Sequence, residues 1–131
     1  MSPQGSDAWA VRLVTPLLGL PQHDEFTVTP LDDTGAVFEL VSTAQEPVRV
    51  FAVAPESFFP GYGPAVSGEV RSRLGLGDGT PRLLALVTPP AEDGGVPTAN
   101  LLAPLVVDPS TGQAVQAVLD GDEWPLRAPL G

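Results

Sequence analysis

Few side chains of this chain have the chemical types that catalysis requires. His23 is the sole histidine, so any Ser-His-Asp arrangement would have to use it. It lies in a Pro-Gln-His-Asp-Glu segment, and no serine has the strand-to-helix setting of an activated nucleophile. We interpret His23 as a residue of an exposed loop and expect no nucleophilic catalysis.

The acidic and glycine-rich segments are candidates for metal and phosphate sites. Asp120, Asp122 and Glu123 offer hard oxygen ligands of the Ca²⁺ or Mg²⁺ type, but their spacing fits no EF-hand loop. We interpret them as an acidic turn. The glycine-rich run 75–79 follows a predicted helix instead of preceding one, so no helix N-terminus could hold a phosphate there.

The chain has no cysteine, which excludes disulfides, thiolate metal sites and thiol catalysis. A pair of carboxylates for glycoside chemistry stays open, because a sequence gives no distance between carboxylates. On these grounds we expect no enzymatic activity, no cofactor and no bound metal.

Length and composition indicate one small domain built from short segments. A chain of 131 residues fits a single domain, and 43% hydrophobic residues suffice for a core. The 16 prolines and 14 glycines leave little room for long helices. We expect a flexible N-terminal end over residues 1–8 and a single domain over residues 9–131.

The charge is strongly negative, with 16 acidic residues against 6 basic ones and a net charge of −10. This charge argues against direct nucleic-acid binding and against an anionic membrane surface. It either attracts a basic partner by raising the association rate or only keeps the protein soluble. The first residues do not form a signal peptide, and no apolar run is long enough to cross a membrane. We therefore predict a soluble, cytoplasmic protein.

Most segments between the turns have the length and pattern of β-strands. They predict an all-β, mainly antiparallel fold. The predicted strands cover residues 9–14, 26–29, 37–41, 48–53, 83–87, 98–107 and 113–119.

One short helix is predicted at about residues 67–75. Ser67 is a suitable N-cap, and Glu69 lies in the first turn. Arg71 and Arg73 come near the last turn, which is the favourable order for the helix dipole. Gly75 is the predicted stop.

The apolar stretch 98–107 contains Pro104, which has no N–H to donate to a sheet ladder. We predict two short strand pieces with a bulge or bend between them, near a sheet edge. Asn100 is the lone strongly polar side chain of this stretch. We favour an amide that organises a turn by hydrogen bonds to backbone groups of a neighbouring loop over one that contacts a partner directly.

Two further segments contain aromatic side chains. The run 57–62 holds two phenylalanines and the only tyrosine around a Pro-Gly turn. It fits either a buried cluster under a loop or a partner-binding patch. The tail 124–130 is apolar and rich in proline, so we expect it to stay out of regular structure, anchored by Trp124 and Leu126.

Three segments together point to a known family: Phe58-Phe59-Pro60-Gly61-Tyr62, Thr98-Ala99-Asn100-Leu101-Leu102-Ala103-Pro104, and Trp124-Pro125-Leu126-Arg127-Ala128-Pro129-Leu130. With them, the chain resembles the flagellar assembly factor FliW family over residues 11–130. The second segment is specific, and the other two support it. The chain departs from the family at Gln22-His23, Gly61 and Ala128, where the family commonly has Gly-Phe, Asp and His.

The resemblance implies a small barrel-like β domain with one short α-helix and no catalytic activity. It also implies two protein partners, flagellin and the RNA-binding translational repressor CsrA. Members of the family bind CsrA and relieve its repression of flagellin synthesis, and free flagellin takes them up when export is blocked. We expect a monomer that binds neither nucleic acid nor membrane directly.

The residues that we predict to contact a partner come from the three segments. The competing hypothesis is a small-ligand-binding β-barrel, or a minor enzyme, with its pocket in the mouth of the barrel. The predicted contact residues are Phe58, Phe59, Tyr62, Asn100, Leu102, Pro104 and Arg127.

Overall fold

The computed structural model describes residues 8–14, 23–64, 66–76, 79–90, 93–119 and 124–130. Of the predicted N-terminal end, residues 1–8, only Ala8 is among them. The elements in these ranges are β1 (Trp9–Leu13), β2 (Glu25–Pro30), β3 (Val37–Ser42), β4 (Arg49–Val53), α2 (Pro55–Phe58), α3 (Gly68–Leu74), β5 (Arg82–Thr88), β6 (Thr98–Ala99), β7 (Leu105–Val107), β8 (Gln113–Gln116) and β9 (Ala128–Pro129).

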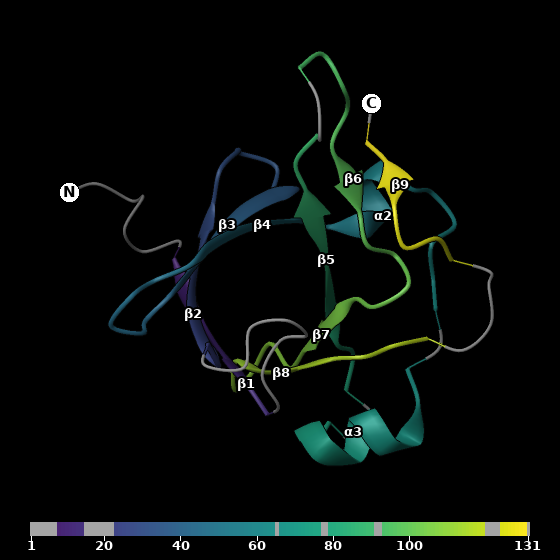
Figure 1. Cartoon of the computed structure of the whole chain (residues 1–131). Coiled ribbons are helices and arrows are strands. Elements are labelled where there is room, and N and C mark those ends of the chain that lie inside the picture. Colours follow the sequence, from purple (N-terminus) through teal and green to yellow (C-terminus); the bar gives the residue numbers. More distant parts are fainter. Residues whose placement is uncertain are drawn as a thin grey trace.

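Seven of the strands close into a barrel (Figure 1). The ring runs β1-β2-β3-β4-β5-β7-β8 and returns to β1, while β6 and β9 extend the sheet from β5. The pairing of β1 with β8 is parallel, and the other pairings are antiparallel. The predicted β fold is confirmed, with two additions: a parallel closure and a second short helix, α2.

The interior of the barrel is a packed apolar core. Along each strand, alternate side chains point inward, as the two-residue period of a strand requires. Phe26, Phe38 and Leu40 are almost completely buried there. At the border of this core, the Arg82 guanidinium lies 4.9 Å from the Trp9 ring centroid and 5.1 Å from that of Phe38. These cation–π contacts place a charge where the apolar core ends.

Helix α3 lies outside the barrel, against β7 and β8 (Figure 1). The Ser67 hydroxyl accepts the Val70 N–H at 3.2 Å, which confirms the predicted N-cap. Gly75 has φ 68° and ends the helix, and the Leu76 N–H donates to the Arg71 carbonyl at 3.0 Å. This is the Schellman arrangement, so both predicted ends of the helix are confirmed.

The stretch 98–107 forms two strand pieces, β6 and β7, with a bend at residues 100–104 between them. The predicted interruption at Pro104 is therefore confirmed. The predicted sheet edge at Pro104 is wrong, because β7 pairs with β5 on one side and with β8 on the other. The Pro104 carbonyl also accepts the Ala117 N–H at 2.9 Å. The proline lies within the wall of the barrel.

The C-terminal tail corrects the prediction that prolines keep it out of regular structure. Ala128 and Pro129 form β9, in which Ala128 pairs with Ala99 of β6. Trp124 packs on the body as predicted. Leu126 is 54% exposed, so its predicted anchoring role is wrong. The local sequence could not show that β6 would offer a partner strand.

Gly112 lies in the loop between β7 and β8, where the chain passes close to β1. It has φ 80°, and a Cβ there would lie 2.6 Å from the Ala10 carbonyl oxygen of β1. Gly35 has φ 72° with open space around it. We expect Gly35→Ala to cost about 1–2 kcal/mol for the left-handed backbone and Gly112→Ala at least about twice that, since β1 must also move.

Chemical unfolding of the two variants beside the parent protein measures this difference. Gly35→Ala is the control for the backbone conformation alone. Equal losses of stability in both variants would contradict the close approach of the loop to β1.

Candidate functional site

The three segments that carry the family resemblance meet on the outer side of β4 and β5, beside α2, β6 and β9 (Figure 1). The Tyr62 hydroxyl donates to the Leu101 carbonyl at 2.8 Å. The Tyr62 ring stands edge-on to the Trp124 ring, with 4.6 Å between centroids. Ala99 pairs with Ala128 in the adjoining strands. We call these five residues the motif cluster, and each segment contributes at least one of them.

Tyr62 is a buried structural residue of this cluster. It is 7% exposed, and burial raises the pKa of its hydroxyl to about 12. The hydroxyl is therefore a neutral donor whose partner is a backbone carbonyl. The run 57–62 was predicted to be either a buried cluster or a partner-binding patch, and Tyr62 is part of a buried cluster.

Asn100 organises the bend between β6 and β7. Its Oδ1 accepts the Leu102 N–H at 3.1 Å and the Ala103 N–H at 2.9 Å. Its own N–H donates to the Leu86 carbonyl at 2.8 Å. The predicted turn-organising role is confirmed, although the acceptor serves its own loop and not a neighbouring one. The side chain is half-buried.

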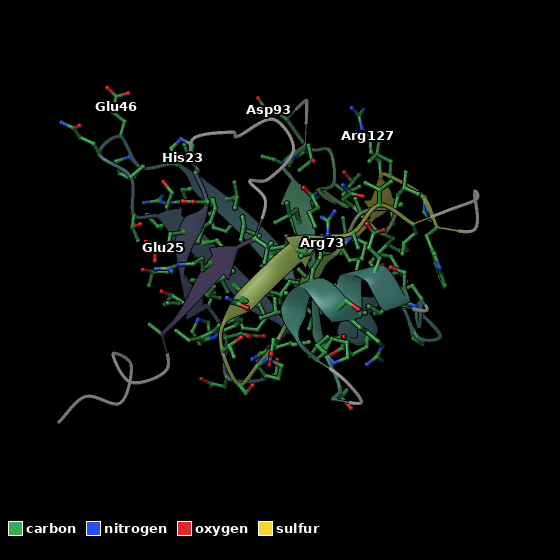
Figure 2. The ribbon with its side chains drawn as sticks, turned by 90° about the horizontal axis from the view of Figure 1, so that it is seen from below. His23, Glu25, Glu46, Arg73, Asp93 and Arg127 are labelled. Atoms are coloured by element: carbon green, nitrogen blue, oxygen red, sulfur yellow. The ribbon has the colours of Figure 1, made fainter. Side chains whose placement is uncertain are left out.

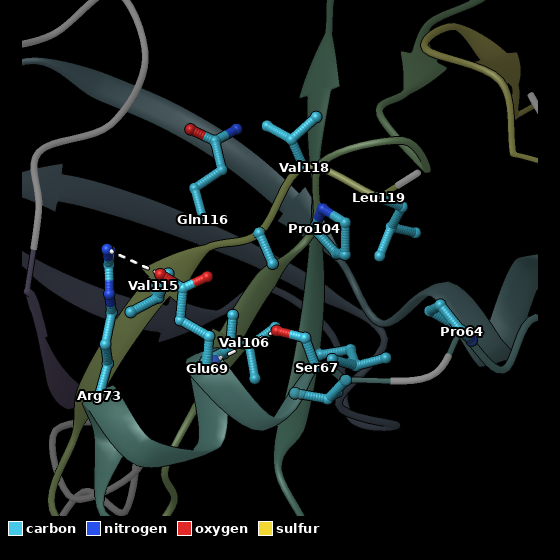
Figure 3. A pocket seen from close by; sticks show the side chains of 14 residues that line it. Pro64, Ser67, Glu69, Arg73, Pro104, Val106, Val115, Gln116, Val118 and Leu119 are labelled. Carbon is cyan, nitrogen blue, oxygen red and sulfur yellow. Dashed lines mark hydrogen bonds and ion pairs between the residues drawn. The ribbon is translucent and has the colours of Figure 1, made fainter. Parts of the chain in front are cut away.

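A groove lies on the outer surface between α3 and the segment 115–119, with a volume of about 350 Å³. We call it the α3 groove. Its apolar part includes Pro104, Val106 and Val115 (Figure 3). At its rim, Arg73 forms an ion pair with Glu69 at 3.4 Å. The complete lining is Pro64, Val66, Ser67, Glu69, Val70, Arg73, Leu83, Pro104, Val106, Val115, Gln116, Ala117, Val118 and Leu119.

The structure divides the predicted contact residues by exposure. Phe58 is 38% exposed, and Arg127 is exposed without an ion pair in the described part of the chain. Figure 2 shows Arg127 pointing away from the body. Phe59 and Leu102 are half-buried. With Tyr62, Asn100 and Pro104 engaged in the fold, the predicted set does not form one continuous surface.

Val118 is an exposed apolar residue that the sequence analysis did not single out. It is 60% exposed and lines the α3 groove. Gln116 could have indicated this in the sequence. It lies two residues after the inward-facing Ala114, on the same face of the strand, and it is polar. That change shows that this face of the strand leaves the core after Ala114, so Val118 cannot be a core residue.

His23 corrects the prediction of an exposed loop histidine. It is half-buried, with Nδ1 2.9 Å from the Ser42 Oγ. The same Oγ accepts the Val48 N–H at 2.8 Å. The Ser42 hydroxyl is thus held in the β3–β4 connection, and the contact is structural.

The described ranges contain no group of three His, Cys, Asp or Glu side chains that could hold a metal ion. The candidates Asp120, Asp122 and Glu123 lie outside those ranges. No helix in the described part of the chain is long and apolar enough to cross a membrane.

The architecture places the chain in the class of small mixed β-barrels, with a groove on the outer surface and a helix packed beside it. The sequence profile described as FliW protein matches residues 4–130 of the chain. The chain belongs to the FliW family of flagellar assembly factors, and it is not an enzyme.

Several relatives cover most of the chain. Flagellar assembly factor FliW 2 of Desulfotalea psychrophila is 32% identical over 115 residues, which are 87% of this chain and 75% of the relative. Flagellar assembly factor FliW of Symbiobacterium thermophilum is 34% identical over 115 residues, 87% of this chain and 83% of the relative. A crystal structure of the flagellar assembly factor FliW matches with a TM-score of 0.80 and 22% identity, covering 100% of this chain and 90% of the other. That structure supports the fold.

The raised pKa of Tyr62 predicts that the protein loses stability at alkaline pH. Its pKa is raised from 10.0 to about 12 in the folded protein, so folding favours the protonated form. This contribution is complete below about pH 10 and is lost as the pH rises to about 12, a change of about 2–3 kcal/mol. Unfolding measured between pH 8 and pH 12 tests it, with pH values spaced by about one unit.

Tyr62→Phe is the matched control. It should cost about 1 kcal/mol at neutral pH through the lost hydrogen bond and lack the alkaline loss. Because Tyr62 is the only tyrosine, its ultraviolet absorbance reports the titration directly. A midpoint near pH 10 would contradict its burial in the motif cluster.

Two substitutions at Asn100 distinguish a side chain that organises the bend from one that contacts a partner. Asn100→Ala removes the acceptor of two backbone N–H groups and should cost about 1–3 kcal/mol. Asn100→Asp keeps an oxygen in the same place and should retain most of that stability. Chemical unfolding of both variants checks this. If Asn100→Asp is as destabilised as Asn100→Ala, the acceptor does not hold the bend.

Proposed function

We propose that this protein binds flagellin and a CsrA-type translational regulator in the cytoplasm. By binding the regulator it relieves the repression of flagellin synthesis, and free flagellin competes for it while export is blocked. Synthesis of flagellin is thereby coupled to assembly of the flagellum. The observation that carries this proposal is membership of the family over residues 4–130.

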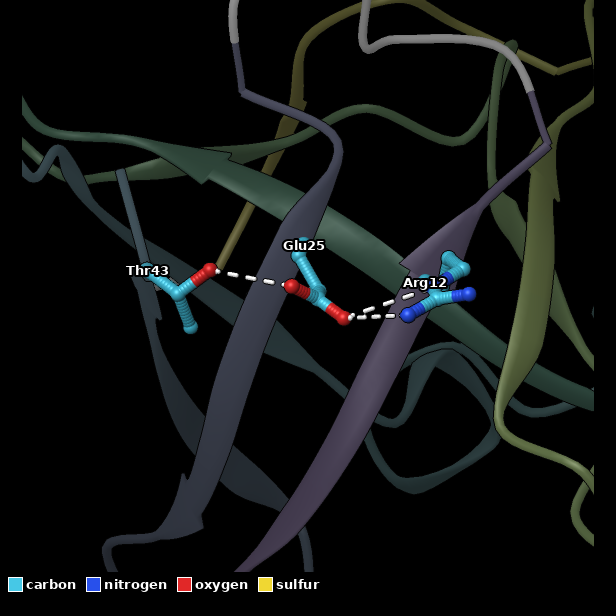
Figure 4. A network of polar contacts seen from close by, with 3 residues as sticks. All are labelled: Arg12, Glu25 and Thr43. Atoms are coloured by element: carbon cyan, nitrogen blue, oxygen red, sulfur yellow. Dashed lines mark hydrogen bonds and ion pairs between the residues drawn. The ribbon is translucent and has the colours of Figure 1, made fainter. Parts of the chain in front are cut away.

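The charge of the protein supports binding to a basic RNA-binding regulator. The net charge is −10, and within the described ranges Arg12, Arg49 and Arg73 form ion pairs with carboxylates on the surface. One pair joins Arg12 to Glu25 at 2.9 Å, with the Thr43 hydroxyl donating to the same carboxylate at 3.2 Å (Figure 4). These pairs leave a large excess of negative charge. Such an excess accelerates encounter with a basic surface and repels RNA.

The surface also supports a non-catalytic, protein-binding role. Phe58, Leu126 and Arg127 are exposed side chains next to the motif cluster, and Val118 is exposed at the α3 groove. Aromatic and arginine side chains are typical anchors of protein interfaces. We propose Phe58 and Arg127, with Leu102 at the bend, as contact residues, whereas Tyr62, Asn100 and Pro104 act by shaping the surface.

The competing hypothesis of a small-ligand-binding barrel, or a minor enzyme, with its pocket in the mouth of the barrel is not favoured. Phe26, Phe38 and Leu40 fill the interior. A barrel that stores a ligand needs open space there.

The rate of association with the regulator tests the proposal. Stopped-flow mixing with purified CsrA should give an association rate that falls roughly tenfold or more as ionic strength rises from about 0.05 to 0.5 M. The reason is that salt screens the attraction between the acidic barrel and the basic partner. Flagellin serves as the second ligand in the same experiment.

Binding of neither protein at micromolar concentrations would contradict the proposed function. A rate for CsrA that does not change with salt would contradict the electrostatic part alone, and the acidity would then serve solubility. Uncharged sugar at matched viscosity controls for slower diffusion.

A further inference from the structure

Arg82 is held in place without an acidic partner. Its guanidinium lies 4.9 Å from the centroid of the Trp9 ring and 5.1 Å from that of the Phe38 ring. In the described part of the chain it forms no ion pair, and its side chain donates no hydrogen bond. Aromatic rings attract the charge of a guanidinium without accepting its N–H groups as a carboxylate would. Arg82 therefore presents a positioned cation with unused donors.

Arg82 lines a cleft of about 400 Å³ between the start of β1 and the loop that follows β7. We call it the Arg82 cleft. Trp9 and Ala10 contribute to it from β1, and residues 109–112 contribute from the loop. Of these lining residues, all of which the structure describes, only Arg82 is charged, and it is exposed. On a protein with a net charge of −10, the cleft is a local site for an anionic group.

The backbone of Ala10 offers a second unused donor in the Arg82 cleft. Along a strand, the N–H groups of alternate residues point to the same side. The Arg12 N–H donates to the Gly112 carbonyl at 2.9 Å, on the side of β8. The Ala10 N–H points the same way, but β8 begins only at Gln113, and this N–H has no acceptor within the described ranges. A ligand in the cleft can therefore accept from it.

The loop contributes shape to the cleft, because its own donors are already used. The Ser110 N–H and hydroxyl donate to Oδ1 of Asp108 at 2.9 and 2.8 Å. The Gly112 N–H donates to the Asp108 carbonyl at 2.8 Å. The carboxylate of Asp108 is engaged in this loop and does not line the cleft. The wall is thus formed before a ligand arrives, which lowers the entropic cost of binding.

The two donors indicate which anionic group fits. A planar guanidinium matches the two oxygens of a carboxylate. A phosphate group carries more negative charge, so the field of this acidic protein repels it more strongly. The Ala10 N–H requires an acceptor of its own, and a polypeptide has a backbone carbonyl beside every acidic side chain. An aspartate or glutamate of another protein can therefore satisfy both donors.

We propose that the Arg82 cleft docks an acidic side chain of a protein partner. Its carboxylate pairs with Arg82, and a neighbouring backbone carbonyl accepts the Ala10 N–H. The acidic surface as a whole attracts a basic protein, whereas the cleft takes one acidic residue of that protein. A contact of opposite sign fixes the orientation in which the two proteins dock. This inference goes beyond the proposed function, because it names the chemistry of one contact and needs no identity for the partner.

Nuclear magnetic resonance with short peptides tests the cleft directly. The isotope-labelled full chain is titrated with the blocked peptide Ala-Glu-Ala and with its uncharged counterpart Ala-Gln-Ala at about pH 6, where glutamate is ionised. The Nε–H of Arg82 and the backbone N–H of Ala10 are the reporters. Propionate is the third probe, since it supplies a carboxylate without a backbone carbonyl.

We expect both reporters to shift and saturate with the glutamate peptide, and the glutamine peptide to bind roughly fivefold or more weakly. Arg82→Lys keeps the charge but loses the planar fork, so it should weaken the glutamate peptide roughly threefold or more. Arg127→Lys is the matched control, because Arg127 is also exposed without an ion pair in the described ranges. It should stay within about twofold of the parent protein. Propionate should bind more weakly than the glutamate peptide.

The opposite results would overturn the inference. These are reporters that do not saturate, equal binding of the glutamate and glutamine peptides, or an unchanged affinity in Arg82→Lys. Propionate that binds as tightly as the glutamate peptide would assign the cleft to free carboxylates and overturn the protein partner. The proposed function is tested separately, because these probes contain neither flagellin nor CsrA.

Discussion

The bend at residues 100–104 is the constraint on which the rest of the structure depends. β5 pairs with β7 over Arg82–Leu84 and with β6 at Val87–Thr88, so one long strand faces two short ones. The chain passes from β6 to β7 only because Pro104 has no N–H for a continuous ladder and Asn100 satisfies the backbone of the turn. β7 then closes the barrel, while β6 holds β9 and the motif cluster outside it. The same bend forms a wall of the α3 groove.

Part of the acidity serves the turns and not a partner. The Thr34 hydroxyl donates to Asp32 and holds the pKa of that carboxyl below its usual range, and Oδ1 of Asp32 accepts the Ala36 N–H at 3.1 Å. The Ser110 hydroxyl and N–H lower the pKa of Asp108 in the same way. These carboxylates stay ionised because the hairpin loops supply donors. Others, such as Glu46 and Asp93, point into solvent (Figure 2). The net charge therefore combines carboxylates that are fixed in turns with others that face solvent.

The sequence predicted those features of the fold that depend only on neighbouring residues. Strand limits followed from two-residue alternation and from turn residues, and both ends of α3 followed from Ser67 and Gly75, whose roles need only neighbouring backbone. Contacts between distant segments could not be predicted in this way. The parallel closure of β1 on β8, the pairing that makes β9 a strand and the exposure of Leu126 depend on where other segments lie. The groove is a further case, because its shape depends on how much of the sheet a two-turn helix covers.

Two positions at which the resemblance implies a departure from the family affect backbone conformation and packing. Gly61, where the resemblance described above leads us to expect Asp, has φ 90°, a backbone conformation that suits glycine. Ala128, where the resemblance described above leads us to expect His, is buried and paired with Ala99. Both lie in or beside the motif cluster, so they alter how its segments pack. A residue such as Val118 is less constrained, because a change there disturbs no buried contact. Substitutions that alter the surface without altering the packing are therefore expected at exposed positions such as Val118 and not within the motif cluster.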